Sequence, residues 1–297
     1  MVASDRIQAQ TTAVRTSAHG AHGEAPESRV GRAYSGLVSA RVTQDPERQV
    51  LVDRAGRAVL SYVPYGGSPG ADAATALVEV DDVVPVVLEQ MAGALLASSE
   101  DALVDALVAA GAVPVRSAHL FSRDLVEDPP DPAWGTPALP PGVRLETDVR
   151  TGGVELIDQG RLSVRAYPHG HADHEGDDPE YAATQLARLY GGEYLGEVLD
   201  GSVLALDGDR LVAVMVVNRM PGRAPLGGPW VSEVFRDPHP HYVGLGTTLL
   251  HRAMAVLGAA GEESLSLVVT EGNPARSIYE RAGFRYCGSS RKVRLPG

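Results

Sequence analysis

The fold is decided by the stretch Pro238-His239-Pro240-His241-Tyr242-Val243-Gly244-Leu245-Gly246-Thr247-Thr248-Leu249-Leu250. The apolar run before it, 230–235, is typical of a short strand, and apolar residues at helical spacing over 247–258 predict a helix after it. The first amide groups of a helix have no partner inside the helix, and the helix dipole adds positive potential there. Because glycine lets a phosphate approach the backbone, we expect an anion-binding turn; the alternative is a plain strand-turn-helix packing unit.

A second informative segment lies downstream, Leu265-Ser266-Leu267-Val268-Val269-Thr270-Glu271-Gly272-Asn273-Pro274-Ala275-Arg276-Ser277-Ile278-Tyr279-Glu280-Arg281-Ala282-Gly283-Phe284. It predicts a strand, a loop, a helix that begins near Pro274, and an end at Gly283-Phe284. Together the two segments resemble the Gcn5-related N-acetyltransferase (GNAT) superfamily. Its cofactor motif is Arg/Gln-x-x-Gly-x-Gly/Ala after a strand, and its second signature is Asn, Ala, Tyr and Gly-Phe. The resemblance covers about 143–295 and implies an α/β fold with a mixed sheet.

Composition limits the possible partners. The chain has 297 residues, 44% of them hydrophobic, which suits two domains, and its net charge is −12. An acidic chain is a poor partner for nucleic acid or an anionic membrane, because both are bound chiefly through Lys and Arg. The single cysteine, Cys287, excludes an intrachain disulfide. With no apolar run of about 18 residues and no signal core in 1–14, we expect a cytoplasmic protein without membrane contact.

Four parts are expected along the chain: a mobile tail (1–29), a degenerate acetyltransferase-like domain (30–125), a proline-rich linker (126–142) and a catalytic domain (143–297). The first domain should contain strands at 36–42, 49–52, 58–63, 76–80 and 113–125 and helices within 83–96 and 101–109. The second should add strands at 143–147, 203–206 and 211–217 and helices at 154–167 and 179–199.

The two halves of the chain show faint internal similarity. Shifting the sequence onto itself places Ala110-Gly111 on Ala282-Gly283 and the expected helix 101–109 on 273–281. The similarity reflects either a duplication or chance. If it is a duplication, the first copy has lost its chemistry, because Leu107 then stands at the position of Tyr279, and 69–74 matches the glycine motif poorly. This two-copy layout is similar to that of the mycothiol synthase family in architecture, not in diagnostic residues.

The resemblance implies acetyl-CoA as co-substrate and no metal. In the superfamily the sheet splays at the strand before the glycine turn, where the pantetheine arm pairs with exposed backbone. By position, Val234, Phe235 and Arg236 would offer that backbone. The residues expected to wrap the pyrophosphate are His241, Tyr242, Val243, Gly244, Leu245, Gly246 and Thr247.

Two departures from the motif concern these residues. His241 stands where Arg or Gln is usual, which makes one phosphate contact weaker and pH-sensitive. Arg236 replaces an apolar residue, so its charge reaches the phosphates or the strand bulges. Asn273 and Arg276 are further candidates for cofactor binding; Asn273 could equally cap the following helix.

The resemblance also implies the catalytic residues. Tyr279 is the candidate general acid for the leaving thiolate, and the alternative is that its ring only packs on the sheet. Glu233, on the strand before the glycine turn, could draw the amine proton through water or simply face solvent, and Glu271 is a second choice. The run 169–174 holds three histidines and Asp173. It could bind a metal, contact the acceptor or form a solvated loop; having no helical register, it is not expected to bind metal.

We therefore expect an acetyl-CoA-dependent N-acetyltransferase that acts on a small-molecule amine. One alternative keeps the fold but uses a longer acyl-CoA or an aminoacyl-tRNA as donor. The only candidates for a basic face are the arginines at 276, 281, 285, 291 and 294. The other alternative is a non-catalytic sensor that binds acyl-CoA.

Overall fold

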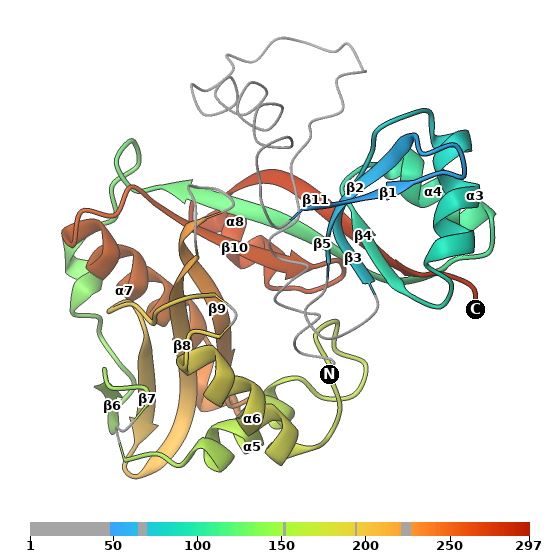
Figure 1. Cartoon of the computed structure of the whole chain (residues 1–297). Coiled ribbons are helices and arrows are strands. Elements are labelled where there is room, and N and C mark those ends of the chain that lie inside the picture. Colours follow the sequence, from blue (N-terminus) through green and yellow to red (C-terminus); the bar gives the residue numbers. More distant parts are fainter. Residues whose placement is uncertain (1–47, 65–69, 151–152, 194, 221–226) are drawn as a thin grey trace. The chain divides into compact units, whose positions relative to one another are not determined.

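The computed structural model of the chain describes residues 48–64, 70–150, 153–193, 195–220 and 227–297 (Figure 1). Contacts divide these residues into two compact units. Unit 1 comprises Leu120–Tyr286, and unit 2 comprises residues up to His119 together with Cys287–Gly297. The expected tail (1–29) and the expected strand at 36–42 lie outside the described residues.

Unit 2 contains a sheet with the strand order β1-β2-β3-β4-β11. Strands β3 and β4 are parallel, and the other pairs are antiparallel. Two helices accompany the sheet, and their buried leucines and valines pack with those of β2 and β4. The elements are β1 (Gln49–Val52), β2 (Ala58–Pro64), β3 (Gly70–Ala76), α3 (Val80–Gln90), β4 (Leu95–Ser98), α4 (Asp101–Ala109), the start of β5 (Val113–Asp124) and most of β11 (Arg285–Arg294).

Unit 1 contains a sheet with the order β5-β10-β9-β8-β7-β6. Strands β9 and β10 are parallel, while β6 to β9 form an antiparallel meander. The elements are η2 (Pro132–Gly135), β6 (Val143–Glu146), α5 (Leu156–Ala166), α6 (Pro179–Tyr190), β7 (Val203–Asp207), β8 (Arg210–Met220), β9 (Gly228–Arg236), η3 (Pro240–Tyr242), α7 (Leu245–Ala259), β10 (Ser264–Thr270) and α8 (Arg276–Arg281). Both sheets and their helices confirm the predicted α/β fold with a mixed sheet.

The last strand of each half of the sequence begins in one unit and ends in the other. The end of β5 lies beside β10 in unit 1, where the Ser266 hydroxyl donates to the Ser122 hydroxyl at 2.9 Å. The last strand, β11, pairs with β4 in unit 2, with Arg291 opposite Ser98. The compact units consequently divide at 119/120 and 286/287, and the predicted linker, 126–142, lies within unit 1.

The two halves repeat one order of elements, which supports a duplication. The series β3-α3-β4-α4-β5 matches β9-α7-β10-α8-β11. In each series the parallel pair is joined by only two residue pairs, and the first strand has an irregular register with its antiparallel neighbour. The alignment of 69–74 with the glycine motif is wrong, because residues 70–76 form strand β3. The turn between β3 and α3, which corresponds to the turn between β9 and α7, is 77–79.

The expected strand at 76–80 is also wrong, because β3 ends at Ala76 and α3 begins at Val80. The aspartates of the first turn of α3 favour this start, since negative charge is stabilised at a helix N-terminus. The helix expected within 83–96 is α3, which ends at Gln90 because β4 begins at Leu95. The helix at 101–109 is confirmed as α4.

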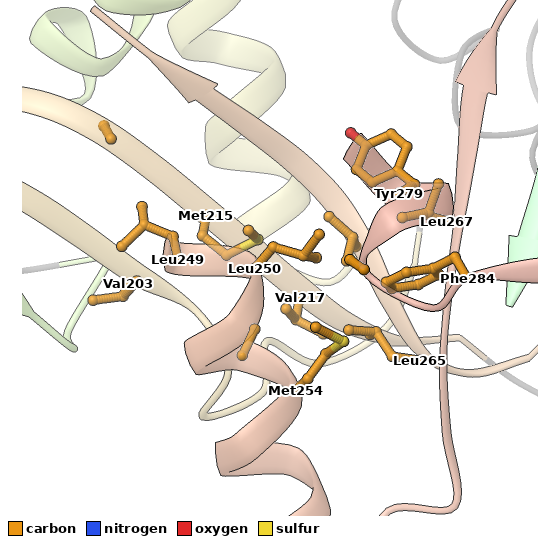
Figure 2. Packing of buried hydrophobic residues seen from close by; sticks show 14 of the residues in the cluster. Val203, Met215, Val217, Leu249, Leu250, Met254, Leu265, Leu267, Tyr279 and Phe284 are labelled. Carbon is orange, nitrogen blue, oxygen red and sulfur yellow. The ribbon is translucent and has the colours of Figure 1, made fainter. Parts of the chain in front are cut away.

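Helices cover both faces of the unit 1 sheet. Figure 2 shows α7 placing Leu249, Leu250 and Met254 against Met215 and Val217 of β8, all within one buried cluster. The alternate β8 residues 214 and 216 are equally buried but lie outside this cluster. Since successive strand side chains point to opposite faces, they face the side on which α5 packs.

Helices α5 and α6 approach each other closely at Gly160. A Cβ atom there would lie 2.2 Å from the carbonyl oxygen of Pro179, so only glycine fits. In the ranges given above, no helix is long and apolar enough to cross a membrane.

Candidate active site

The sheet of unit 1 opens between β9 and β10. These strands are paired only at Trp230 with Ser266 and at Val231 with Leu267. Strand β9 nevertheless continues to Arg236, with its other edge still paired to β8. Residues 233–236 therefore present one edge that is not covered by β10.

Two residues direct their backbone groups to this open edge. The Asp237 amide donates to the Val212 carbonyl at 2.7 Å, and the register with β8 is regular from Glu233 to Arg236. Because N–H and C=O groups of successive strand residues alternate in direction, those of Val234 and Arg236 face the opening. Those of Phe235 face β8, so two of the three residues predicted from sequence have backbone groups at the open edge.

The N-terminus of α7 adjoins the open edge. Gly244 precedes the helix in a left-handed conformation (φ 88°), which glycine adopts without strain. A Cβ atom on Gly246 would lie 3.9 Å from Cγ2 of Val234, so the turn runs close beside β9. The amides of Leu245, Gly246 and Thr247 belong to the first helical turn and have no partner inside the helix. An elongated ligand with a diphosphate group, such as coenzyme A, fits this pairing of helix N-terminus and strand edge.

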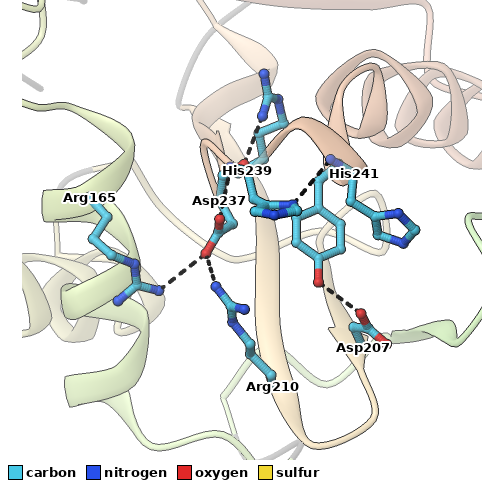
Figure 3. A network of polar contacts seen from close by, with 8 residues as sticks. Arg165, Asp207, Arg210, Asp237, His239 and His241 are labelled. Carbon is cyan, nitrogen blue, oxygen red and sulfur yellow. Dashed lines mark hydrogen bonds and ion pairs between the residues drawn. The ribbon is translucent and has the colours of Figure 1, made fainter.

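A polar network fixes the chain between β9 and α7 (Figure 3). The side chain of Asp237 is 4% exposed, accepts from the His239 amide at 3.0 Å and forms an ion pair with Arg210 at 2.5 Å. Burial acts to raise the pKa of Asp237, but the hydrogen bond from His239 and the charge of Arg210 together hold it below its ordinary value. Arg165 lies farther away, at 3.7 Å. The carboxylate is therefore charged and anchors the turn.

The aromatic and basic residues of the turn have separate roles. Tyr242 is buried, and its hydroxyl donates to Asp207 at 2.8 Å, a bond that raises the pKa of Tyr242. His241 is exposed, and Figure 3 shows its ring directed away from Asp237. Arg236 donates to the carbonyl oxygen of Asp237 at 2.7 Å, so its charge stays beside the turn.

A pocket lies between α5, α6 and β9, with a volume of about 50 Å³. Four of its lining residues carry carboxylates, and none is Lys or Arg. These four are Asp173, Glu175, Asp178 and Glu233. Such a lining favours a cationic group, and it places Glu233 both in the pocket and on β9.

The histidine run contributes little to this pocket. Asp173 is its one member among the lining residues, and His169, His171 and His174 are absent from the lining. Within the described part of the chain, no group of three His, Cys, Asp or Glu is placed to hold a metal ion.

The connection between α5 and α6 (167–178) is bonded to both sides of the opening. The Tyr167 hydroxyl donates to the Val234 carbonyl at 2.9 Å. The Asp173 carboxylate accepts from the Thr270 hydroxyl and from the Asn273 amide group, both at 2.5 Å. Sequence reasoning missed the role of Tyr167 and considered Asp173 only as a member of the run 169–174, because nothing in the local pattern identifies their partners.

Tyr279 combines a packed ring with a hydroxyl directed elsewhere. The side chain is 8% exposed, belongs to the unit 1 core and meets Phe284 edge to face at 6.1 Å. Figure 2 shows its oxygen pointing away from the packed side chains. Sequence reasoning gave packing and acid catalysis as alternatives. The two are compatible, because the ring packs in the core while the hydroxyl points away from it.

The other candidates lie around α8. Asn273 accepts from the Ala275 amide at 2.8 Å in the turn before α8, whose N-cap is Ala275, while its amide group reaches Asp173. Arg276 pairs with Glu280 at 2.9 Å and lies over the Phe121 ring at 5.6 Å. Glu271 is exposed.

Unit 2 has an equivalent opening, but its own side chains occupy the strand edge. The Ser98 hydroxyl donates to the Ala74 carbonyl at 2.6 Å. Glu100 accepts from the Ala76 amide at 2.9 Å. The first turn of α3 is acidic and would repel a phosphate. Unit 2 thus lacks both features of the site in unit 1.

The chain was compared with known protein families, curated proteins and solved structures. No known family profile matches the chain. A curated mycothiol acetyltransferase from Beutenbergia cavernae is 36% identical over 151 residues, which cover 49% of this chain and 46% of that protein. The chain thus spans about half the length of that relative.

Two solved structures share the fold. A GCN5-related N-acetyltransferase from Sphaerobacter thermophilus has a TM-score of 0.55 and 17% identity, covering 90% of this chain and 85% of its own. A tandem GNAT protein from the clavulanic acid biosynthesis pathway has a TM-score of 0.53 and 15% identity, covering 84% and 83%. The chain therefore has the two-copy fold of the Gcn5-related N-acetyltransferase superfamily and shares sequence with a protein of the mycothiol synthase type.

Proposed function

We propose that the chain is an acetyl-CoA-dependent N-acetyltransferase that acts on the amine of a small molecule, with its active site in unit 1. The observation that carries the proposal is the open edge of β9 directly beside the N-terminus of α7. The name of the mycothiol acetyltransferase relative supports the same reaction class.

Different backbone groups of unit 1 would bind the different parts of acetyl-CoA. The amides of Leu245, Gly246 and Thr247 would hold the diphosphate, because they converge at the positive end of α7. The backbone groups of Val234 and Arg236 would pair with the pantetheine arm. Bound acetyl-CoA supplies an acetyl group activated as a thioester. Binding along β9 would orient that group toward the pocket that contains Glu233.

Two side chains would transfer protons during the reaction, one as a base and one as an acid. Glu233 would accept a proton from the ammonium group of the acceptor through a water molecule, leaving the nitrogen lone pair free to attack the acetyl carbon. As the carbon–sulfur bond breaks, the Tyr279 hydroxyl would donate its proton to the sulfur atom. The net result is an amide and a free thiol.

The pocket supports a cationic acceptor. Its carboxylates attract an ammonium group, and no basic side chain lines it to oppose one. Amines related to mycothiol are the first compounds to test, because the curated relative carries that name. Since acetyl-CoA is available in the cytoplasm, we also propose a cytoplasmic location.

The structure argues against an aminoacyl-tRNA donor. Of the arginines suggested as a basic face, Arg276 is paired with Glu280, and Arg291 is paired with Asp101 and Asp105. Their charges are therefore partly neutralised, which weakens attraction to a nucleic-acid backbone.

Thiol release tests the proposal. The protein is mixed with acetyl-CoA and a panel of amines, and free coenzyme A is measured with a chromogenic disulfide. Release that depends on one of the amines is expected. Binding of acetyl-CoA without amine-dependent release across the panel would instead favour a non-catalytic sensor.

A further inference from the structure

The connection 167–178 occupies a backbone group that a cofactor would need. Tyr167 ends α5, and its hydroxyl donates to the Val234 carbonyl at 2.9 Å. Its ring meets Phe235 edge to face at 6.0 Å and lies 5.0 Å from the His171 ring, so it is held over the end of β9. Val234 is one of the two residues whose backbone groups face the opening. The Tyr167 hydroxyl and a pantetheine arm therefore compete for the same place on the strand edge.

The second anchor of the connection lies across the opening. Asp173 holds the Thr270 hydroxyl and the Asn273 amide group, both beyond the end of the paired part of β10. The connection consequently spans the opening, with one bond to β9 and two to the segment that follows β10. Tyr167 and Asp173 also line the acidic pocket. A ligand that releases Tyr167 from Val234 must change the shape of that pocket.

In unit 2, side chains of the protein itself bond to the equivalent strand edge. There the strand edge is bonded by the carboxylate of Glu100 and the hydroxyl of Ser98. Hydrogen bonds to charged groups are stronger than those between neutral groups. In unit 1 the bond to Val234 comes from a neutral phenol, which exchanges more easily for another donor.

We propose that Tyr167 is a positioning residue shared by the cofactor and acceptor sites. Its hydroxyl holds the Val234 carbonyl until the pantetheine arm displaces it, and the release moves the connection 167–178 and reshapes the acceptor pocket. This inference rests on the proposed function, because it concerns the same two sites.

Calorimetry with coenzyme A tests the competition. Tyr167→Phe removes the hydroxyl but keeps the ring, so coenzyme A should bind about three- to ten-fold more tightly, as expected for the loss of one competing neutral hydrogen bond. Tyr62→Phe is the matched control, since Tyr62 donates to Gln49 at 2.9 Å in unit 2. Its affinity for coenzyme A should equal that of the wild type. An affinity of Tyr167→Phe equal to or weaker than the wild type would overturn the proposal.

Hydrogen exchange on the wild-type protein gives a second test that needs no variant. The amides of His171, Asp173 and His174 donate within the connection. They should exchange faster after coenzyme A is added, because the anchor at Tyr167 is lost. Unchanged or slower exchange with coenzyme A bound would contradict the release. If the wild type bound no coenzyme A, the proposed function itself would fail, so the two failures are distinguishable.

Discussion

The indole ring of Trp134 lies flat on the imidazole ring of His251, with centroids 4.1 Å apart and planes 11° from parallel. The buried guanidinium of Arg123 lies 5.6 Å from the Trp134 ring and donates to the Ala282 carbonyl at 2.6 Å. A Cβ atom on Gly258 would lie 3.1 Å from Pro130. The proline-rich segment thus packs along α7, whose N-terminus forms the proposed diphosphate site.

Removing the indole ring should loosen this packing. Trp134→Ala should lower the free energy of unfolding by about 2 kcal/mol, because a half-buried aromatic surface and its stacking are lost. Trp134→Phe retains most of the stacking and should cost less. Urea unfolding of both variants measures the difference; equal stability of Trp134→Ala and the wild type would show that the stack contributes nothing.

The same stack predicts a dependence of stability on pH. Burial, with the nearby charge of Arg123, lowers the pKa of His251. The unfolded state therefore binds more protons between that lowered pKa and about 6.5, the ordinary value. The contribution of His251 to stability is fully present above pH 6.5 and is lost as the pH falls toward the folded pKa.

His251→Phe isolates this effect, since phenylalanine keeps the stacked ring but does not titrate. Thermal unfolding of both proteins from pH 7.5 to 5.5 should show the wild type losing more stability than the variant. Parallel curves for the two proteins would contradict a lowered pKa at this position.

Gly244 should matter for binding more than for folding. Gly244→Ala places a side chain at φ 88°, costs about 1 kcal/mol and shifts the amides of the turn, so coenzyme A should bind about ten-fold more weakly. Gly261→Ala is the matched control, because Gly261 has φ 84°, lies beyond the C-terminus of α7 and likewise meets nothing within 4 Å. It should lose similar stability and keep its affinity. Equal losses of affinity would argue against the turn as the diphosphate site.

Tyr279→Phe separates acid catalysis from packing. The phenylalanine ring keeps the contact with Phe284, so thermal stability and coenzyme A affinity should change little. Turnover should fall about 100-fold, the usual contribution of a positioned general acid. Steady-state kinetics with calorimetry on the same sample measures both quantities. A variant with wild-type turnover would exclude the hydroxyl as the acid.

Most elements of unit 1 could be predicted because their signals are local. Helical spacing over 247–258 predicted α7 (Leu245–Ala259), and the strands expected at 203–206 and 211–217 are β7 and β8. The backbone donors of the candidate site followed in the same way, since a glycine turn before a helix specifies them without reference to distant residues.

Features that depend on distant partners were missed. Strand β3 is rich in Gly, Ala and Asp, which are poor strand formers, and its pairing with β2 makes it a strand. The exchange of β5 and β11 between the units has no local signal. Tyr167 and Asp173 bond to residues 67 and 100 positions away, so no motif around them reveals their roles.

Titration of the wild-type chain with coenzyme A in a calorimeter tests the central claim most directly. The open edge of β9 beside α7 predicts one binding site per chain, because the side chains of Ser98 and Glu100 occupy the equivalent edge in unit 2. One site per chain whose affinity falls in Gly244→Ala would agree with the account. No binding to the folded protein, or one site that is insensitive to Gly244→Ala, would contradict it.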